Sequence, residues 1–165
     1  MSEKIHILCV EDEPDVLDVI VRELSVLEDV FPVESAASSD EAREVLADIE
    51  AEGGSVGVIF CDHIMPGENG VEFLVSLRKT EHYRDTRKVL LTGQAGLDAT
   101  VKAVNEAGLA HYIAKPWDAD ELVLVAREQL SRYVAARQLN PLPYLKHLVM
   151  DLVGDTLRDS LKSDR

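Results

Sequence analysis

Four places in the chain carry polar side chains directly after a short apolar segment, where a folded protein could use them for chemistry. They are the acidic run Glu11-Asp12-Glu13, then Asp62, Thr92 and Lys115. Each alone has an ordinary explanation, because acids after a strand usually lie in a solvated loop, and single threonines and lysines are common at surfaces. The chemistry therefore depends on whether the fold brings the four together.

Gathered at one point, these side chain types would suit phosphoryl transfer to an aspartate. Carboxylates held close together raise one another's pKa values unless a cation lies among them. Oxygen ligands suit a hard ion such as Mg²⁺, which typically uses one or two carboxylates with water and phosphate oxygens. A metal ion beside an ammonium group neutralises a transferring phosphoryl group, and an aspartate carboxylate is a competent acceptor. The threonine hydroxyl and the lysine ammonium would donate hydrogen bonds to the phosphoryl oxygens.

The elements that must position these groups follow from the hydrophobic pattern. Five short apolar segments predict strands at 5–10, 31–37, 56–61, 88–91 and 110–114. The stretches between and after them predict helices from 14 to about 27, 39 to about 51, after 70, 97–107, and 118 to about 139. This alternation indicates an α/β domain with a parallel sheet covered on both faces. Ligands of such sheets lie outside the carboxyl ends of the strands, where the four polar groups fall.

Four sequence blocks then resemble a known family. They are Val10-Glu11-Asp12-Glu13-Pro14, Cys61-Asp62-His63-Ile64-Met65-Pro66-Gly67-Glu68-Asn69-Gly70, Leu91-Thr92-Gly93 and Ala114-Lys115-Pro116-Trp117. In order and spacing they resemble the receiver domains of response regulators in two-component signalling, over about residues 4 to 138. The resemblance implies a flavodoxin-like, doubly wound, five-stranded parallel sheet of the (βα)5 type with strand order 2-1-3-4-5.

The resemblance also implies roles for the residues of the first two blocks. Asp62 takes the position of the phospho-acceptor. Glu11 and Asp12 take the place of the acidic pair that holds Mg²⁺, Asp12 more directly and Glu11 mainly through water. Asp62 and the backbone carbonyl of Ile64 would complete the metal site. Aspartate is the commoner residue at position 11, so we expect a changed metal geometry there and not a lost site.

The remaining blocks imply a phosphoryl clamp and a switch. Thr92 and Lys115 would each bind a phosphoryl oxygen, and the peptide bond after Lys115 is expected in cis. Thr92 and Tyr112 would act as the switch pair, changing the face formed by the fourth helix, the fifth strand and the fifth helix. Ile64 and Gln94 flank the path of the water that hydrolyses the phosphoaspartate. Because Ile64 offers that water no polar group, we expect slow dephosphorylation.

The chain is strongly acidic, and this limits its partners. It has 17 Lys and Arg residues against 31 Asp and Glu, a net charge of −14. Such a surface repels nucleic acid and anionic lipid. The start of the chain has no signal-peptide pattern, and no segment approaches the roughly 20 apolar residues of a membrane span. Cys9 and Cys61 end apolar segments without metal-ligand spacing, so we expect buried thiols and a cytoplasmic protein. From the net charge we expect no direct binding of nucleic acid or membrane.

We divide the chain into a receiver domain, 1–138, and an amphipathic helical extension, 139–165. The extension begins with the break Asn140-Pro141-Leu142-Pro143. Apolar residues then recur at helical spacing, at Leu145, Leu148, Val149, Leu152, Val153, Leu157 and Leu161. We expect one helix that either folds back on its own domain or pairs with a second copy, and we favour the homodimer. A stand-alone receiver and the receiver end of a longer regulator both remain open.

The predicted function is a response regulator of a phosphorelay, with a histidine kinase or phosphotransfer protein as donor and an unidentified downstream protein as target. Two alternatives fit parts of the pattern. An aspartyl-phosphate phosphatase on a similar sheet usually has a second Asp two residues after its nucleophile, where this chain has Ile64. An interaction module that works without phosphorylation would not need all five residues of the phosphorylation site. In this chain they are all present, at Glu11, Asp12, Asp62, Thr92 and Lys115. We therefore expect a signalling domain and no enzyme beyond its own phosphorylation and dephosphorylation.

Overall fold

The computed structural model describes residues 3–93 and 103–163 and contains one five-stranded parallel sheet. The strands are β1 (Ile5–Val10), β2 (Val33–Ala36), β3 (Ser55–Asp62), β4 (Arg87–Thr92) and β5 (His111–Ala114). Their order is β2-β1-β3-β4-β5, and every neighbouring pair is parallel. The predicted fold class and strand order are confirmed. The carboxyl ends of β1 and β3, which carry the acids, lie side by side because these strands are neighbours.

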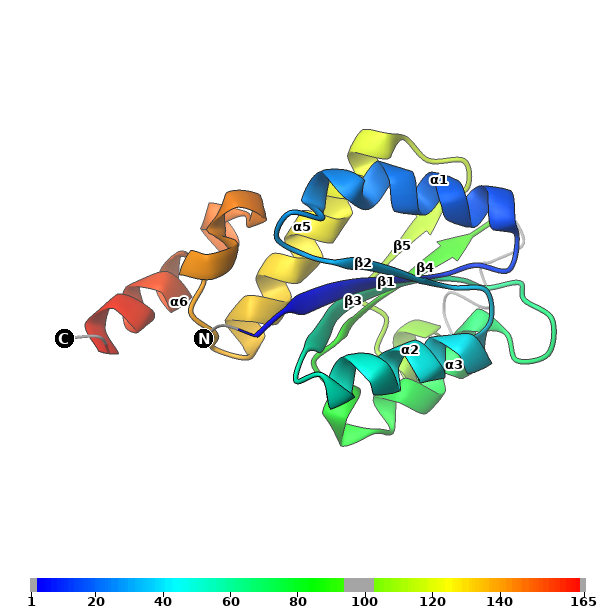
Figure 1. The fold of residues 1–165 in the computed structure, drawn as a ribbon, viewed down its shortest axis with the longest axis horizontal. Helices are drawn as coiled ribbons and strands as arrows, with labels where there is room; N and C mark the ends of the chain where they lie inside the picture. The colour runs from blue at the N-terminus through cyan, green and yellow to red at the C-terminus, as the bar shows by residue number, and fades with distance from the viewer. Residues whose placement is uncertain (1–2, 94–102, 164–165) are drawn as a thin grey trace.

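Helices cover both faces of the sheet (Figure 1). They are α1 (Pro14–Leu24), α2 (Ser39–Ala51), α3 (Gly70–Arg78) and α5 (Ala119–Ala136). Alternate strand residues point to opposite faces. Accordingly Ile7 and Cys9 of β1 pack into a core with α1 and α5, whereas Leu8 and Val10 pack into a second core with α2 and α3. Every residue of β1 is buried, which explains why its sequence is apolar apart from His6.

Several predicted elements differ in extent from the observed ones, and the helix predicted to about 139 ends at Ala136. The second strand begins at Val33, later than expected, because Phe31 lies in the core before the strand starts. The first helix ends at Leu24 and continues as a short 3-10 segment, Ser25–Leu27. Of the helix predicted at 97–107, the structure describes only Ala103–Ala107, a π-helical turn, and the rest lies outside the described residues. None of the described helices is long and apolar enough to cross a membrane.

The expected single helix of the extension is wrong in detail, because the chain forms a 3-10 segment, Leu142–His147, and then α6 (Met150–Ser163). Side chains of α5 take the backbone hydrogen bonds between the two. The Arg127 Nε donates to the His147 carbonyl at 3.1 Å, and the Val149 N–H donates to the Ser131 Oγ at 2.8 Å. Backbone groups satisfied by α5 do not need a helical partner, so the helix begins only at Met150.

The extension packs against the core cluster that the sheet shares with α1 and α5. Tyr144, Leu148 and Val153 are buried in the same cluster as α1 and α5. The Tyr144 ring stacks on Phe31, with 5.8 Å between ring centroids, and the Tyr144 hydroxyl donates to the Glu3 carbonyl at 2.5 Å. The extension therefore covers apolar surface of the strand-and-helix domain.

Lys88, at the start of β4, is a buried lysine whose stability contribution depends on pH. Its Nζ donates to the carbonyls of Tyr83 and Thr86 at 3.1 and 2.9 Å, and burial lowers its pKa from 10.5 to about 8. The unfolded chain therefore binds more protons between about pH 8 and pH 10.5, so the free energy of unfolding should rise with pH across that interval. The total rise in the free energy of unfolding is at most about 3 kcal/mol, because each unit of pKa difference corresponds to about 1.4 kcal/mol.

The measurement is urea unfolding from about pH 7 to about pH 10.5 for the wild type and Lys88→Met. The variant should lose the rise, while Lys79→Met, at an exposed lysine, should follow the wild type. Equal pH profiles for Lys88→Met and the wild type would contradict this assignment.

Candidate functional site

Three carboxylates meet at the carboxyl ends of β1 and β3. Glu11, Asp12 and Asp62 each offer an oxygen, and these oxygens lie within 4.8 Å of one another. Glu11 and Asp62 are buried, and Asp12 is half-buried. Adjacent strand ends force this approach, because Asp62 is the last residue of β3 and Glu11 directly follows β1.

Lys115 reaches into this acidic cluster from the loop after β5. Its Nζ donates to Asp62 Oδ1 at 2.8 Å and to Glu11 Oε1 at 3.2 Å. Burial lowers the pKa of Lys115, but the carboxylates of Asp62 and Glu11 outweigh it and leave the pKa raised. Lys115 therefore stays charged, and its peptide bond to Pro116 is cis, as expected.

One ammonium does not neutralise three carboxylates. The pKa of Glu11 is raised to about 7, first by burial and then by the charge of Asp62, with Lys115 acting in the opposite direction. A divalent cation among the oxygens would remove this repulsion. The ligands are all oxygen, as Mg²⁺ prefers, and Asp12 leaves one side of the cluster open to water. The residues present therefore fit a Mg²⁺ site.

The loop from Asp62 to α3 is held by contacts that the sequence patterns did not reveal. A β-carbon at Gly70 would overlap the backbone carbonyl of Asp62, so only glycine allows this close approach. Asn69 caps α3 in a reciprocal pair with Glu72. Glu68 forms a two-pronged ion pair with Arg43 of α2, at 2.8 and 2.9 Å. Gly70 could be identified from the sequence as part of the block that contains Asp62, but no sequence pattern predicts that Arg43 pairs with Glu68.

The predicted switch residues lie on the two neighbouring strands at this edge. Thr92 ends β4, is buried, and its hydroxyl donates to the Gly93 carbonyl at 3.1 Å. Tyr112, on β5, lies opposite Leu90 of β4 and is 53% exposed. Ile64, in the loop after Asp62, is 72% exposed. Gln94 lies outside the described residues.

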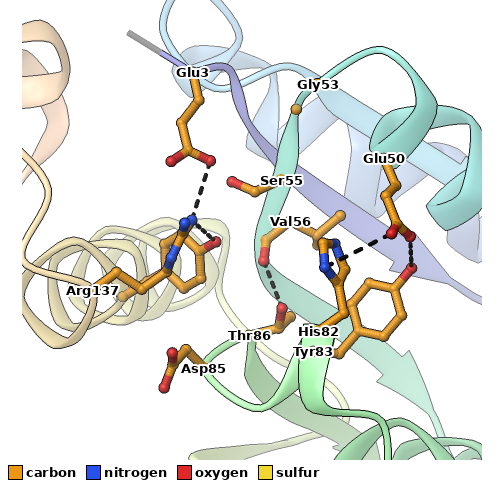
Figure 2. Close-up of a pocket in the computed structure, with 12 residues that line it drawn as sticks. Glu3, Glu50, Gly53, Ser55, Val56, His82, Tyr83, Asp85, Thr86 and Arg137 are labelled. Carbon is orange, nitrogen blue, oxygen red and sulfur yellow. Dashed lines mark hydrogen bonds and ion pairs between the residues drawn. The ribbon is translucent and has the colours of Figure 1, made fainter.

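A second hollow, of about 410 Å³, lies at the other end of the sheet, around the amino ends of β3 and β4 (Figure 2). Several of its polar groups are paired with one another. Arg137 binds Glu3 at 3.1 Å, and the Tyr83 hydroxyl donates to Glu50 at 3.3 Å. The carboxylates of Glu11, Asp12 and Asp62 instead converge closely enough to hold a metal ion, so we take their cluster as the candidate site.

Known proteins match this chain over the same elements. Residues 7–127 match the response regulator receiver domain family. The hydrogenase transcriptional regulatory protein HoxA of Cupriavidus necator is 36% identical over 129 residues, which are 78% of this chain and 25% of HoxA. Response regulator Rre1 of Synechocystis is 29% identical over 82% of this chain and 56% of Rre1. The chain thus spans about a quarter to a half of these relatives.

Solved structures agree with the sequence matches. The signal receiver domain of an HD domain-containing protein from Pseudomonas fluorescens Pf-5 has a TM-score of 0.72 and 27% identity, covering 84% of this chain and 95% of that one. A CheY-like response regulator receiver domain protein from Methanospirillum hungatei has a TM-score of 0.68 and 27% identity, covering 82% and 99%. By fold, family match and relatives, this chain belongs to the response regulator receiver domain family.

Proposed function

We propose that Asp62 accepts a phosphoryl group from a histidine kinase or phosphotransfer protein, in a reaction that requires Mg²⁺. The observation that carries the proposal is the position of the Lys115 ammonium, 2.8 Å from Asp62 and 3.2 Å from Glu11, within a cluster of three carboxylates. Glu11, Asp12, Asp62 and the backbone carbonyl of Ile64 would hold the metal ion. When bound, Mg²⁺ supplies positive charge to the phosphoryl oxygens during transfer.

The chain's own residues would perform the other parts of the reaction. A carboxylate oxygen of Asp62 forms the new bond to phosphorus while the bond from phosphorus to the donor histidine nitrogen breaks. Lys115, already beside Asp62, donates to a phosphoryl oxygen. Thr92 would exchange the Gly93 carbonyl for a phosphoryl oxygen as its acceptor. Lysine and threonine thus neutralise and orient the group without taking up a proton.

Phosphorylation would change the surface of the domain at the edge of the sheet next to Thr92. We infer that a moved Thr92 changes the packing beside Tyr112 and shifts the population of two arrangements of β5 and its neighbouring segments. Tyr112 is 53% exposed in this structure. The output is then contact with a downstream protein, because a net charge of −14 disfavours nucleic acid. Two buried free thiols fit a reducing cytoplasm.

The proposal is tested by incubating the chain with acetyl phosphate, a small-molecule phosphodonor, with Mg²⁺ and with a chelator. We expect the mass of one phosphoryl group to be added only with Mg²⁺, and peptide mapping to find it on Asp62. Trp117, the only tryptophan, follows the Lys115-Pro116 pair and should report metal binding by fluorescence. Labelling that is equal in the chelator, or that maps to another residue, would refute the proposal.

Ile64 should set the lifetime of the phosphoryl group. Its exposed apolar side chain gives an attacking water no hydrogen bond. Ile64→Asn should therefore speed dephosphorylation by about fivefold, the effect of one hydrogen bond of about 1 kcal/mol. The check is the decay of the phosphorylated mass after removal of the donor, with Ile64→Leu as the apolar control. Equal lifetimes for Ile64→Asn and Ile64→Leu would contradict the prediction.

A further inference from the structure

Helix α6 carries an apolar stripe that is separate from the side packed on the receiver. Val153 faces the core and is fully buried. Met150, Gly154, Leu157 and Leu161 instead follow the spacing 4, 3, 4, which places them along one other side of the helix. They line a hollow of about 400 Å³ together with Asp151, Asp155 and Arg158, and all of these residues belong to α6. The far part of α6 projects from the rest of the chain (Figure 1).

We propose that this stripe pairs with α6 of a second copy of the chain, with the two helices antiparallel. In the antiparallel register, Leu157 of one copy lies opposite Gly154 of the other, and Met150 lies opposite Leu161. The large side chain of Leu157 then fills the space left by the missing side chain of Gly154. Two-fold symmetry produces each of these pairs twice, so one short stripe yields four apolar layers. A parallel pair would place Gly154 against Gly154 and leave that space empty.

The charges beside the stripe favour the same direction. Asp151 and Arg158 both flank the stripe, one near each end of the hollow. Antiparallel pairing brings Asp151 of one copy toward Arg158 of the other, whereas in a parallel pair both residues would face the uncharged flank of Val153 and Ser160. Arg158 also pairs with Asp155 of its own helix, which holds its guanidinium along this flank. Asp159 is on the opposite side of the helix, away from the stripe.

The position of α6 also suits a second copy as the occupant. The receiver lies at the start of α6, so antiparallel pairing places the two receivers at opposite ends of the helix pair (Figure 1). The helix has 14 residues and the contact is small, so we expect a weak dimer of the transient class. It should form on the order of 100 µM and not at nanomolar concentration. The proposal does not depend on phosphorylation of Asp62.

The test is sedimentation velocity of the full 165-residue chain over a concentration series. The wild type should show an average mass that rises toward twice the monomer mass. Leu161→Glu should keep the chain monomeric, whereas Leu142→Glu should behave as the wild type. These two leucines are a matched pair, since each is 48% exposed and only Leu161 is in the stripe. A wild type that stays monomeric, or equal effects of the two substitutions, would overturn the proposal.

Two further variants test the register and direction. Gly154→Leu should weaken association at least tenfold without unfolding the chain, because a β-carbon at Gly154 meets only the Arg158 side chain, 3.7 Å away. Asp151→Lys and Arg158→Glu should each weaken the dimer, and the double variant should regain most of the loss. If the double variant is weaker than both single variants, or if Gly154→Leu dimerises as the wild type does, the antiparallel pairing is wrong. Circular dichroism confirms that each variant keeps its helices.

Discussion

Asp62→Asn is expected to abolish phosphoryl transfer to this chain while the fold is retained. The amide has almost the same shape as the carboxylate, but its neutral oxygen is a poor nucleophile. Lys115 keeps its second partner, Glu11, at 3.2 Å, and one source of repulsion in the cluster is removed. Intact mass should show no added phosphoryl group over the time in which the wild type is fully labelled. Urea unfolding should show that the variant is folded.

Glu11→Gln is the matched control, because it removes a different carboxylate from the same cluster. It should slow labelling at low Mg²⁺ and recover at high Mg²⁺, since Asp12 and Asp62 still offer oxygens to the metal ion. Asp62→Asn should not recover at any Mg²⁺ concentration. Labelling of Asp62→Asn at the wild-type rate would show that another residue is the acceptor, and the proposed function would fail.

Removal of residues 139–165 is expected to cost the receiver a large part of its stability. Tyr144, Leu148 and Val153 of the extension are buried in the core with α1 and α5. Burial of an apolar side chain contributes about 1.5–3 kcal/mol, so the three together contribute roughly 5–9 kcal/mol. A domain of this size has about 5–15 kcal/mol in total. Urea unfolding of residues 1–138 should therefore give a much lower midpoint than the full chain, or no cooperative transition.

Two substitutions at Tyr144 separate the contribution of its ring to stability from the contribution of its hydroxyl. Tyr144→Ala should destabilise the full chain by about 3 kcal/mol, because it leaves a cavity against Phe31. Tyr144→Phe should cost only about 1 kcal/mol, the value of the hydrogen bond to the Glu3 carbonyl. A chain ending at Val149 retains Tyr144 and Leu148 and should be intermediate. If residues 1–138 unfold at the same urea concentration as the full chain, the extension adds nothing to the core.

Local patterns in the sequence were sufficient to predict the sheet. β1 and β3 are mostly apolar segments, and the alternation of such segments with amphipathic stretches predicts parallel strands under helices. The carboxyl ends of such strands meet at one edge, so the approach of Glu11, Asp12 and Asp62 follows from their place after β1 and at the end of β3. Strand order came from the resemblance of the four blocks to receiver domains, and the structure confirms it.

The tertiary structure alone decided which partners these residues have. Lys115 contacts both Asp62 and Glu11, residues 53 and 104 positions away, and Arg43 meets Glu68 across 25 positions. No periodicity encodes such contacts. The extension shows the same limit. Its apolar spacing predicts one helix, but Arg127 and Ser131 of α5 take the backbone hydrogen bonds around Leu148 and interrupt it. Short-range patterns determine where strands and helices form, whereas in the extension hydrogen bonds from a distant helix determine where α6 begins.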